Sequence, residues 1–333
     1  MKNKTLKTIL AGAAAAVMLL GGTAVYAEET TESTAEAATE AAGEEAEAEA
    51  EEDYTTGDAS LDNVRNQDEI GEKELLVISF GTSFNDNRRL TIGAIEEAME
   101  EAFPDYSVRR GFTSNIIIDH VNSRDGILID DVEAALNRAV DNGVKTLVIQ
   151  PTHLMDGLEY QDVEAMVAEY ADSFEQVVMG EPLLSSEEDF DAVAAAITDA
   201  TSEYDDGQTA ICFMGHGTEA ESNEVYAKMQ EKLTELGFEN YYVGTVEAAP
   251  TLDDVLAAVQ EGEYTKVVLQ PLMVVAGDHA NNDMAGEEEG TWKTTFEDAG
   301  YEVECVLSGL GEIPAIQDLY VAHAQAAIDS LAE

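Results

Sequence analysis

The stretches KTLVIQPTHLMDG (residues 145–157) and TKVVLQPLMVVAGD (265–278) follow one pattern and decide the fold. Each begins with a β-branched, apolar run that has the length and composition of a buried strand. Each run then ends in Gln-Pro, at Gln150-Pro151 and at Gln270-Pro271. Since the same strand and the same ending occur twice, we expect the chain to be built from two similar halves.

The sequence on either side of this pair repeats as well. TAICFMGHGT (209–218) stands in the second half where LLVISFGTS (75–83) stands in the first. YEVECVLSGLGE (301–312) corresponds in the same way to FEQVVMGEPLLS (174–185). Amphipathic helical stretches lie between the strand-like runs, as in RRLTIGAIEEAMEEAF (88–103), where apolar residues recur near helical spacing.

This alternation of strand and helix predicts the fold class. Strand, helix and strand in succession are typical of βαβ units and of a parallel sheet. We therefore predict an α/β fold of two similar Rossmann-like halves, residues 72–205 and 206–333, each a parallel sheet flanked by helices. A cleft between two such halves, lined by the carboxyl ends of the strands, is a natural ligand site.

The first 71 residues lack this pattern. Residues 1–27 begin with three lysines, continue without charge and end in small residues, which is typical of a secretory signal peptide. The uncharged run of about 20 residues could also just span a bilayer as an uncleaved anchor. Residues 28–53 hold twelve acidic residues and no basic one, so we predict an acidic, disordered linker over 28–71.

These features predict an exported protein, periplasmic or otherwise extracytoplasmic, that is not stably inserted in a membrane once the signal is cleaved. The formal net charge is −54, and 56 Asp and Glu face 13 Lys and Arg after residue 62. A chain this acidic is not expected to bind nucleic acid. A P-loop and a G-x-G-x-x-G fingerprint are both absent, so no nucleotide is expected either. The pattern leaves open whether the protein is a homo-oligomer.

Five polar stretches begin where an apolar, strand-like run ends. They are SFGTS (79–83), PTHLMDGLEY (151–160), MGHGTEA (214–220), VGTVEAAP (243–250) and AGDHANND (276–283). Because the carboxyl ends of parallel strands meet at one edge of a sheet, these stretches are expected to lie together. Three of the five histidines in the chain fall on them.

The candidate site residues come from these stretches. His216 lies between two glycines, His279 follows a strand, and Glu247 follows another strand among small apolar residues. Two imidazoles and one carboxylate are a plausible site for Co²⁺, Fe²⁺, Ni²⁺ or Zn²⁺. The spacing matches no short metal motif, and a hydrogen-bonded loop histidine or a helix cap are the plain structural alternatives. His153 and Glu159 form the matching pair in the first half.

Ten motifs together resemble the CbiK family, the anaerobic-type sirohydrochlorin cobaltochelatases, which are class II chelatases related in fold to ferrochelatase. In order from about residue 74 to 331 they are LVISFGTS, RGFTSNIII, RDGI, PTHLMDGLEY, PLLSS, FMGHG, VGTVE, QPLMVVAGDHANNDM, TWKTTF and LSGLGEIPAI. The resemblance implies insertion of Co²⁺ into sirohydrochlorin without ATP, on the anaerobic route to cobalamin. It also implies that His216 and His279 bind the metal and are catalytic, with Glu247 as the carboxylate ligand. The signal peptide and the acidic spacer are not part of the usual cytoplasmic family pattern.

The implied substrate predicts further contacts. Sirohydrochlorin is a large apolar disc that carries many carboxylates, so its face needs apolar walls and its rim needs cations. The expected walls are Phe80, Phe112, Leu154, Met155 and Met273, and the hypothesised rim contacts are Arg88, Arg89, Arg109, Arg110 and Lys293. The full set of expected substrate-binding residues is Phe80, Thr82, Ser83, Arg110, Thr113, His153, Glu159 and Lys293.

Two other functions remain compatible with the same residues. One is an exported protein that binds a tetrapyrrole or a metal for uptake without turnover. The other is an iron or nickel chelatase on the same fold, because two histidines and a glutamate do not determine which divalent metal is used.

Overall fold

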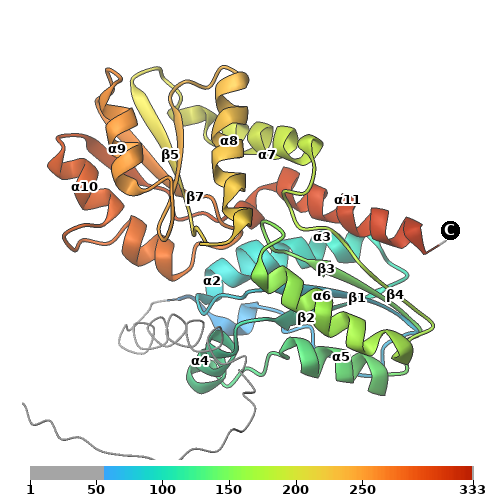
Figure 1. Cartoon of the computed structure of the whole chain (residues 1–333). Helices are drawn as coiled ribbons and strands as arrows, with labels where there is room; N and C mark the ends of the chain where they lie inside the picture. The colour runs from blue at the N-terminus through green and yellow to red at the C-terminus, as the bar shows by residue number, and fades with distance from the viewer. Residues whose placement is uncertain (1–55, 332–333) are drawn as a thin grey trace, which may run out of the picture. The chain divides into compact units, whose positions relative to one another are not determined.

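The computed structural model describes residues 56–331, so the predicted signal peptide and the linker residues 28–55 lie outside the described residues. Within that range the strands form two parallel four-stranded sheets, in the orders β2-β1-β3-β4 and β6-β5-β7-β8 (Figure 1). The strands are β1 (Lys73–Ser79), β2 (Ser107–Phe112), β3 (Thr146–Pro151), β4 (Gln176–Met179), β5 (Thr209–Gly215), β6 (Tyr241–Thr245), β7 (Lys266–Pro271) and β8 (Glu302–Cys305). The predicted α/β fold with two similar parallel-sheet halves is confirmed.

The two Gln-Pro pairs occupy equivalent places in the two sheets. Gln150 of β3 lies beside Val77 of β1, and Gln270 of β7 lies beside Phe213 of β5. Both glutamine side chains donate to a backbone carbonyl that follows the neighbouring edge strand, Glu181 in the first half and Ser308 in the second. The Gln-Pro repeat in the sequence therefore reflects a repeated hydrogen bond, by which the central strand holds the chain that follows the edge strand.

Helices cover both faces of each sheet (Figure 1). One face of the first sheet packs against α5 (Val132–Asp141) and α6 (Leu158–Tyr170), and the other against α3 (Ala94–Ala102) and α11 (Pro314–Ser330). The second sheet has α9 (Leu252–Gln260) and α10 (Trp292–Asp298) on one face. On its other face, α8 (Glu224–Glu235) and α7 (Glu187–Ala200) join a core that is shared by the two halves.

The expected division at residue 205 needs one correction, because α11 returns to the first half. This last helix packs against α3, β3 and β4, and Figure 1 shows it running along the first sheet. The buried Tyr320 hydroxyl donates to the carbonyl of Thr152 at the end of β3, 2.8 Å away. The C-terminal half is therefore not self-contained, since its last helix buries its apolar side against the N-terminal sheet.

The helix predicted over residues 88–103 consists of three segments. A short helix α2 (Asn85–Arg88) leads into a π-helical turn η2 (Arg89–Gly93), and α3 follows. Thr91 within the turn donates its hydroxyl to the carbonyl of Asn87, 2.6 Å away. Insertions of this kind are frequent at functional sites, and Ile92 of this turn lines the larger cavity described below.

Residues 56–71, predicted as part of a disordered linker, are folded onto the first half. The Asp62 carboxylate lies buried between the guanidinium groups of Arg88 and Arg110, at 2.7 Å from each. Arg65 pairs with the buried Glu96 at 3.0 Å. Disorder was predicted from the high content of charged residues in this segment. The prediction was wrong because these charges form ion pairs with residues that lie 26 to 48 positions further along the chain, and composition does not show such pairs.

No helix among residues 56–331 combines the length and the apolar character that crossing a membrane requires.

Candidate metal centre

His216 is presented by a tight turn at the end of β5, and both flanking glycines are required for that turn. A Cβ atom on Gly215 would lie 2.1 Å from the ring of Tyr226. Gly217 has φ +89°, and a Cβ there would lie 2.8 Å from the backbone nitrogen of Ala248. The glycines thus let the backbone approach its neighbours closely, which leaves His216 as the one side chain that the turn presents.

Glu247 is held next to His216 by the backbone. The N–H of Val246 donates to the carbonyl of Gly215 at 3.0 Å, and the N–H of Glu247 donates to the carbonyl of His216 at 2.9 Å. These two bonds continue the pairing of β5 and β6 beyond the ends of the strands. The Glu247 side chain itself is exposed, so it can turn toward the imidazole or away from it.

His279 lies after β7, at the start of the π-helical turn η6 (Ala280–Met284). The Asn281 side chain donates to the carbonyl of Gly277 at 2.7 Å and so fixes the beginning of this turn. The rings of His216 and His279 lie 4.7 Å apart, centroid to centroid, at an angle of 86°. One ligand atom from each of His216, Glu247 and His279 lies within 4.8 Å of the other two.

The hydrogen bonds of the two imidazoles decide which nitrogen faces a metal. His216 Nδ1 lies 2.7 Å from the carbonyl oxygen of Gly217, and His279 Nδ1 lies 2.6 Å from the carboxylate of Asp283. Both oxygens can only accept, so each Nδ1 carries the proton and each Nε2 presents its lone pair. Ligand atoms at about 2.0–2.2 Å from a shared ion lie closer together than 4.8 Å, so a small rotation of the exposed Glu247 completes the set.

Two cavities meet at His216. The larger holds about 350 Å³ and is lined by residues that follow β1, β3, β5 and β7. The smaller holds about 100 Å³ and includes both His216 and His279. Phe80, His216 and Met273 line both cavities, so His216 lies where the two spaces join, with His279 on the smaller one.

Some of the predicted substrate-binding residues line these cavities. Phe80, His153 and Glu159 line the larger cavity, and Phe80 and Thr82 line the smaller one. The predicted apolar walls Leu154, Met155 and Met273 line the larger cavity as well.

Three other predicted contacts are buried elsewhere or lie outside the cavity linings. Ser83 is fully buried, and neither Ser83 nor Thr113 is in a cavity lining. Phe112 is fully buried, and the close approach of its ring to Gly81 leaves no space for a Cβ there. Phe112 therefore packs against the loop that contains Gly81 and does not form a wall of either cavity.

The prediction of Arg110 as a rim contact was wrong. Its guanidinium is fully buried and donates to both carboxylate oxygens of Asp62 and of Glu96, at distances between 2.7 and 3.0 Å. These carboxylates compensate the burial and hold the pKa of Arg110 above its usual range. A fully buried arginine that gives four of its five side-chain N–H groups to these carboxylates does not reach the edge of a substrate.

The other hypothesised rim cations are also missing from the linings of the two cavities. Arg88 and Arg109 are buried in ion pairs, Arg89 is about one third exposed near Asp86, and Lys293 pairs with Glu287 on the surface. Of the described residues that line the two cavities, none is Lys or Arg. The predicted cationic rim is therefore absent from these linings.

Asp283 is the site residue that sequence reasoning missed. It lies four residues after His279, and residues four apart face the same side of a helical turn. That spacing was a usable signal, but the sequence could not say whether the carboxylate points to the imidazole or to solvent.

The family model described as "Cobalt chelatase (CbiK)" matches residues 73–329. The chain belongs to this family. The CbiK match begins at β1, so the folded segment 56–72 precedes the matched residues.

Two curated relatives agree with the CbiK membership, and one solved structure shares the fold. Sirohydrochlorin cobaltochelatase of Salmonella typhimurium is 37% identical over 262 residues, covering 79% of this chain and 98% of the relative. Sirohydrochlorin cobaltochelatase CbiKC of Nitratidesulfovibrio vulgaris is 31% identical over 278 residues, covering 82% and 97%. The structure of SirB from Bacillus subtilis with Fe³⁺ aligns with a TM-score of 0.55 at 12% identity, over 79% of this chain and 98% of SirB, which shows a common fold.

Proposed function

We propose that this protein binds Co²⁺ through His216, Glu247 and His279 and inserts it into sirohydrochlorin without ATP. One observation carries the proposal: three ligand atoms converge, and the residue that supplies one of them, His216, lies where two cavities with mainly apolar walls meet. The two relatives named sirohydrochlorin cobaltochelatase supply the substrate class.

The geometry supports a transfer in which the protein ligands are exchanged for macrocycle nitrogens. Three protein ligands leave coordination positions open on the ion. His216 lines both cavities, so an ion on its Nε2 faces the larger space, where the macrocycle would lie between Phe80, Met155 and Met273. These apolar walls exclude water from the face of the disc. As the divalent ion enters, the macrocycle must release two N–H protons.

The proposal also specifies Co²⁺ as the metal that is inserted. Imidazole and carboxylate ligands also suit Fe²⁺ and Ni²⁺, so we take these ions as competitors. Equimolar mixtures of two metals, followed by separation of the metallated products, give the preference directly. A product that contains mainly iron or nickel would reassign the physiological metal while leaving the chelatase reaction intact.

The decisive experiment is an anaerobic, visible-absorbance time course. The protein lacking residues 1–27 is mixed with excess sirohydrochlorin and Co²⁺, beside a His216→Ala variant. His323→Ala is the matched control, because His323 bonds Asp189 and a backbone carbonyl and lies in neither cavity lining. Many turnovers by the wild type and by the control, lost in His216→Ala, are expected. Binding that stops at one equivalent, with metal entering no faster than in buffer, would instead identify a carrier.

We also propose that the protein acts outside the cytoplasm. Support comes from the composition of residues 1–27 and from the acidic stretch that follows them. Cell fractionation followed by amino-terminal sequencing tests this. We expect mature protein that begins at Glu28 in the extracytoplasmic fraction, and full-length protein confined to the cytoplasm would contradict it.

A further inference from the structure

His153 is a buried imidazole that the metal centre does not use. It follows β3 in the first half, lines the larger cavity, and its side chain is 8% exposed. Among the described residues, neither of its ring nitrogens has a hydrogen-bond partner. Buried polar groups without a partner destabilise a fold and are rare, so such a group calls for an explanation.

The surroundings of His153 keep its ring neutral. Leu154, Met155 and Tyr160 lie next to it in the cavity wall, and the Tyr160 ring meets the imidazole edge-on at 6.5 Å. This desolvation lowers the pKa of His153 to about 4. At neutral pH the ring therefore offers one lone pair and one N–H.

Glu159 connects this buried ring to solvent. It lies in the first turn of α6 and also lines the larger cavity, and its side chain is 50% exposed. One of its carboxylate oxygens is 3.7 Å from His153 Nε2. This is just beyond hydrogen-bonding distance, so a small movement of either side chain closes the gap.

His153 and His216 approach the larger cavity from different halves of the protein. Both groups of side chains that could hold a metal within residues 56–331 contain His279, and neither contains His153. The first half thus contributes a neutral base and a route to water, while the second half contributes the metal ligands.

We infer that His153 accepts the protons that the macrocycle loses on metal insertion and passes them through Glu159 to solvent. This inference rests on the proposed function. A pyrrole N–H bond breaks, and the proton bonds to His153 Nδ1. The imidazolium then gives its Nε2 proton to the Glu159 carboxylate, which releases it to water. The neutral ring regains its starting tautomer when cavity water takes the proton from Nδ1 and returns a proton to Nε2, and the route runs twice for each Co²⁺.

The first test separates substrate binding from turnover. His153→Gln keeps a polar side chain of similar size but cannot relay a proton. We expect kcat for cobalt insertion to fall about 100-fold or more, the range of general acid–base catalysis. The dissociation constant of metal-free sirohydrochlorin, measured by fluorescence quenching, is expected to stay within about threefold of the wild-type value. The control is His323→Gln, which is expected to keep the wild-type kcat.

The second test asks whether the two residues act as one route. Glu159→Gln alone is expected to slow insertion. The double variant with His153→Gln is expected to be no slower than His153→Gln, since residues that act in series are not additive. In His153→Ala, added imidazole should restore part of kcat, and more basic substituted imidazoles should restore it better.

The outcomes divide cleanly. Wild-type kcat in His153→Gln would overturn the inference. A fall in activity that imidazole does not restore, with weaker sirohydrochlorin binding, would overturn it in favour of a binding contact. If the wild type itself showed no turnover, the proposed function would fail first, and that result is distinct from either of the others.

Discussion

At the scale of single residues, the two histidines proposed to bind the metal are anchored differently. A backbone carbonyl fixes the ring of His216, whereas the side chain of Asp283 fixes the ring of His279. The first anchor follows from the fold of the turn and cannot be removed by substitution. The second can be removed, so it offers a way to test how much the orientation of a ligand contributes to the site.

We expect Asp283→Asn to weaken the binding of Co²⁺ by about 10- to 100-fold, the usual effect of removing a partner of a metal-binding histidine. Asparagine can still accept from Nδ1, so the ring keeps its place, but the negative charge that makes the imidazole a stronger ligand is lost. Isothermal titration of the macrocycle-free protein measures this. Asp253→Asn, on the exposed side of α9, is the control, and equal affinities for the two variants would show that Asp283 has no such role.

His153 also predicts how stability depends on pH. Its pKa is lowered to about 4 in the folded protein, against about 6.5 in an unfolded chain. The unfolded state therefore binds the proton first, and the contribution of His153 to stability is present above pH 6.5 and is lost as the pH falls toward 4. Between pH 7.5 and 5 this loss amounts to about 2 kcal/mol.

Urea unfolding of the wild type and of His153→Gln at these two pH values checks the prediction. The free energy of unfolding should fall by about 2 kcal/mol less in the variant, because glutamine does not titrate. Parallel pH profiles for the two proteins would refute it.

At the scale of elements, a buried network of ion pairs joins residues 56–72 to β2 and to the loop after β1 that contains Thr82. Asp62 binds both Arg88 and Arg110, and Arg88 donates onward to the carbonyl of Thr82 at 3.0 Å. Thr82 lines the smaller cavity, so this added segment supports one wall of the site. The segment lies before the residues that the CbiK family model matches.

Removing Asp62 leaves two buried guanidinium groups short of a partner. We expect Asp62→Ala to lower the free energy of unfolding by about 3–5 kcal/mol, which is typical when one partner of a buried ion pair is removed. Urea denaturation at pH 7.5 measures the change.

Asp58→Ala is the matched control for Asp62→Ala. Asp58 lies four residues earlier in the same segment and is exposed, and its side chain bonds only Ser60 among the described contacts. Little change is expected from it, and similar losses in the two variants would mean that the ion network does not hold the segment.

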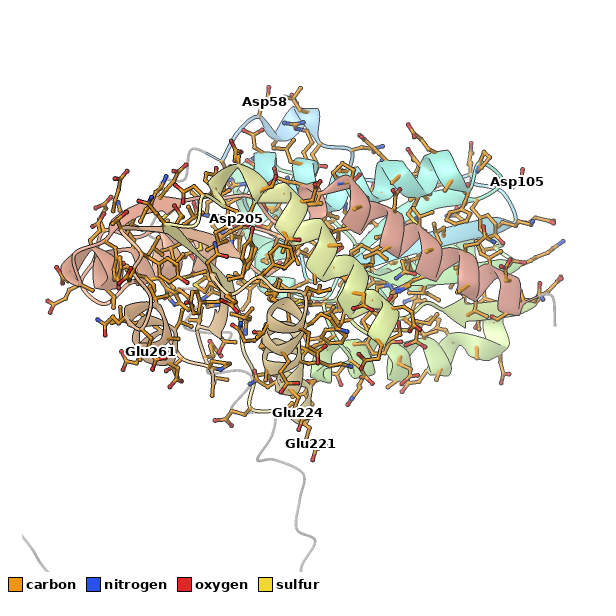
Figure 2. All side chains as sticks on the ribbon, turned by 90° about the horizontal axis from the view of Figure 1, so that it is seen from above. Asp58, Asp105, Asp205, Glu221, Glu224 and Glu261 are labelled. Carbon is orange, nitrogen blue, oxygen red and sulfur yellow. The ribbon has the colours of Figure 1, made fainter. Side chains whose placement is uncertain are left out.

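At the scale of the whole molecule, the excess of acidic residues is spread over the surface of both halves. Figure 2 shows Asp58 and Asp105 of the first half, and Asp205, Glu221, Glu224 and Glu261 further along the chain, projecting from different elements. The described residues that line the cavities include no Lys or Arg that would offset this charge locally. The two proposed substrates have opposite charges, so the field of the protein attracts one and repels the other.

This predicts opposite salt effects on the two substrates. Raising the ionic strength from about 0.02 to 0.2 M shortens the range of surface charges to less than about 10 Å. We expect kcat/KM to fall for Co²⁺, which loses attraction, and to rise for sirohydrochlorin, which loses repulsion. Initial rates with each substrate varied in turn give both values, and changes of the same sign would argue against control by the net charge.

The sequence by itself determined the architecture of the halves and the three proposed metal ligands. The Gln-Pro repeat predicted two parallel sheets because it marks the same strand position in each half. The glycines around His216 and the strand ends before Glu247 and His279 predicted convergence, since parallel strands end at one edge. The repeat, the glycines and the strand ends can all be recognised in the sequence, because they are local features or follow from the order of strands and helices.

Only the tertiary structure decided which charged side chains are free to contact a substrate and which are paired within the protein. Arg110 and Lys293 both lie in family-like motifs, yet one is buried in a network and the other pairs on the surface. The same network folds residues 56–71, whose composition predicted disorder. Pairing between residues far apart in the chain depends on packing, which no local pattern contains. For the same reason, only the structure shows that His153 is buried in the cavity wall beside Glu159.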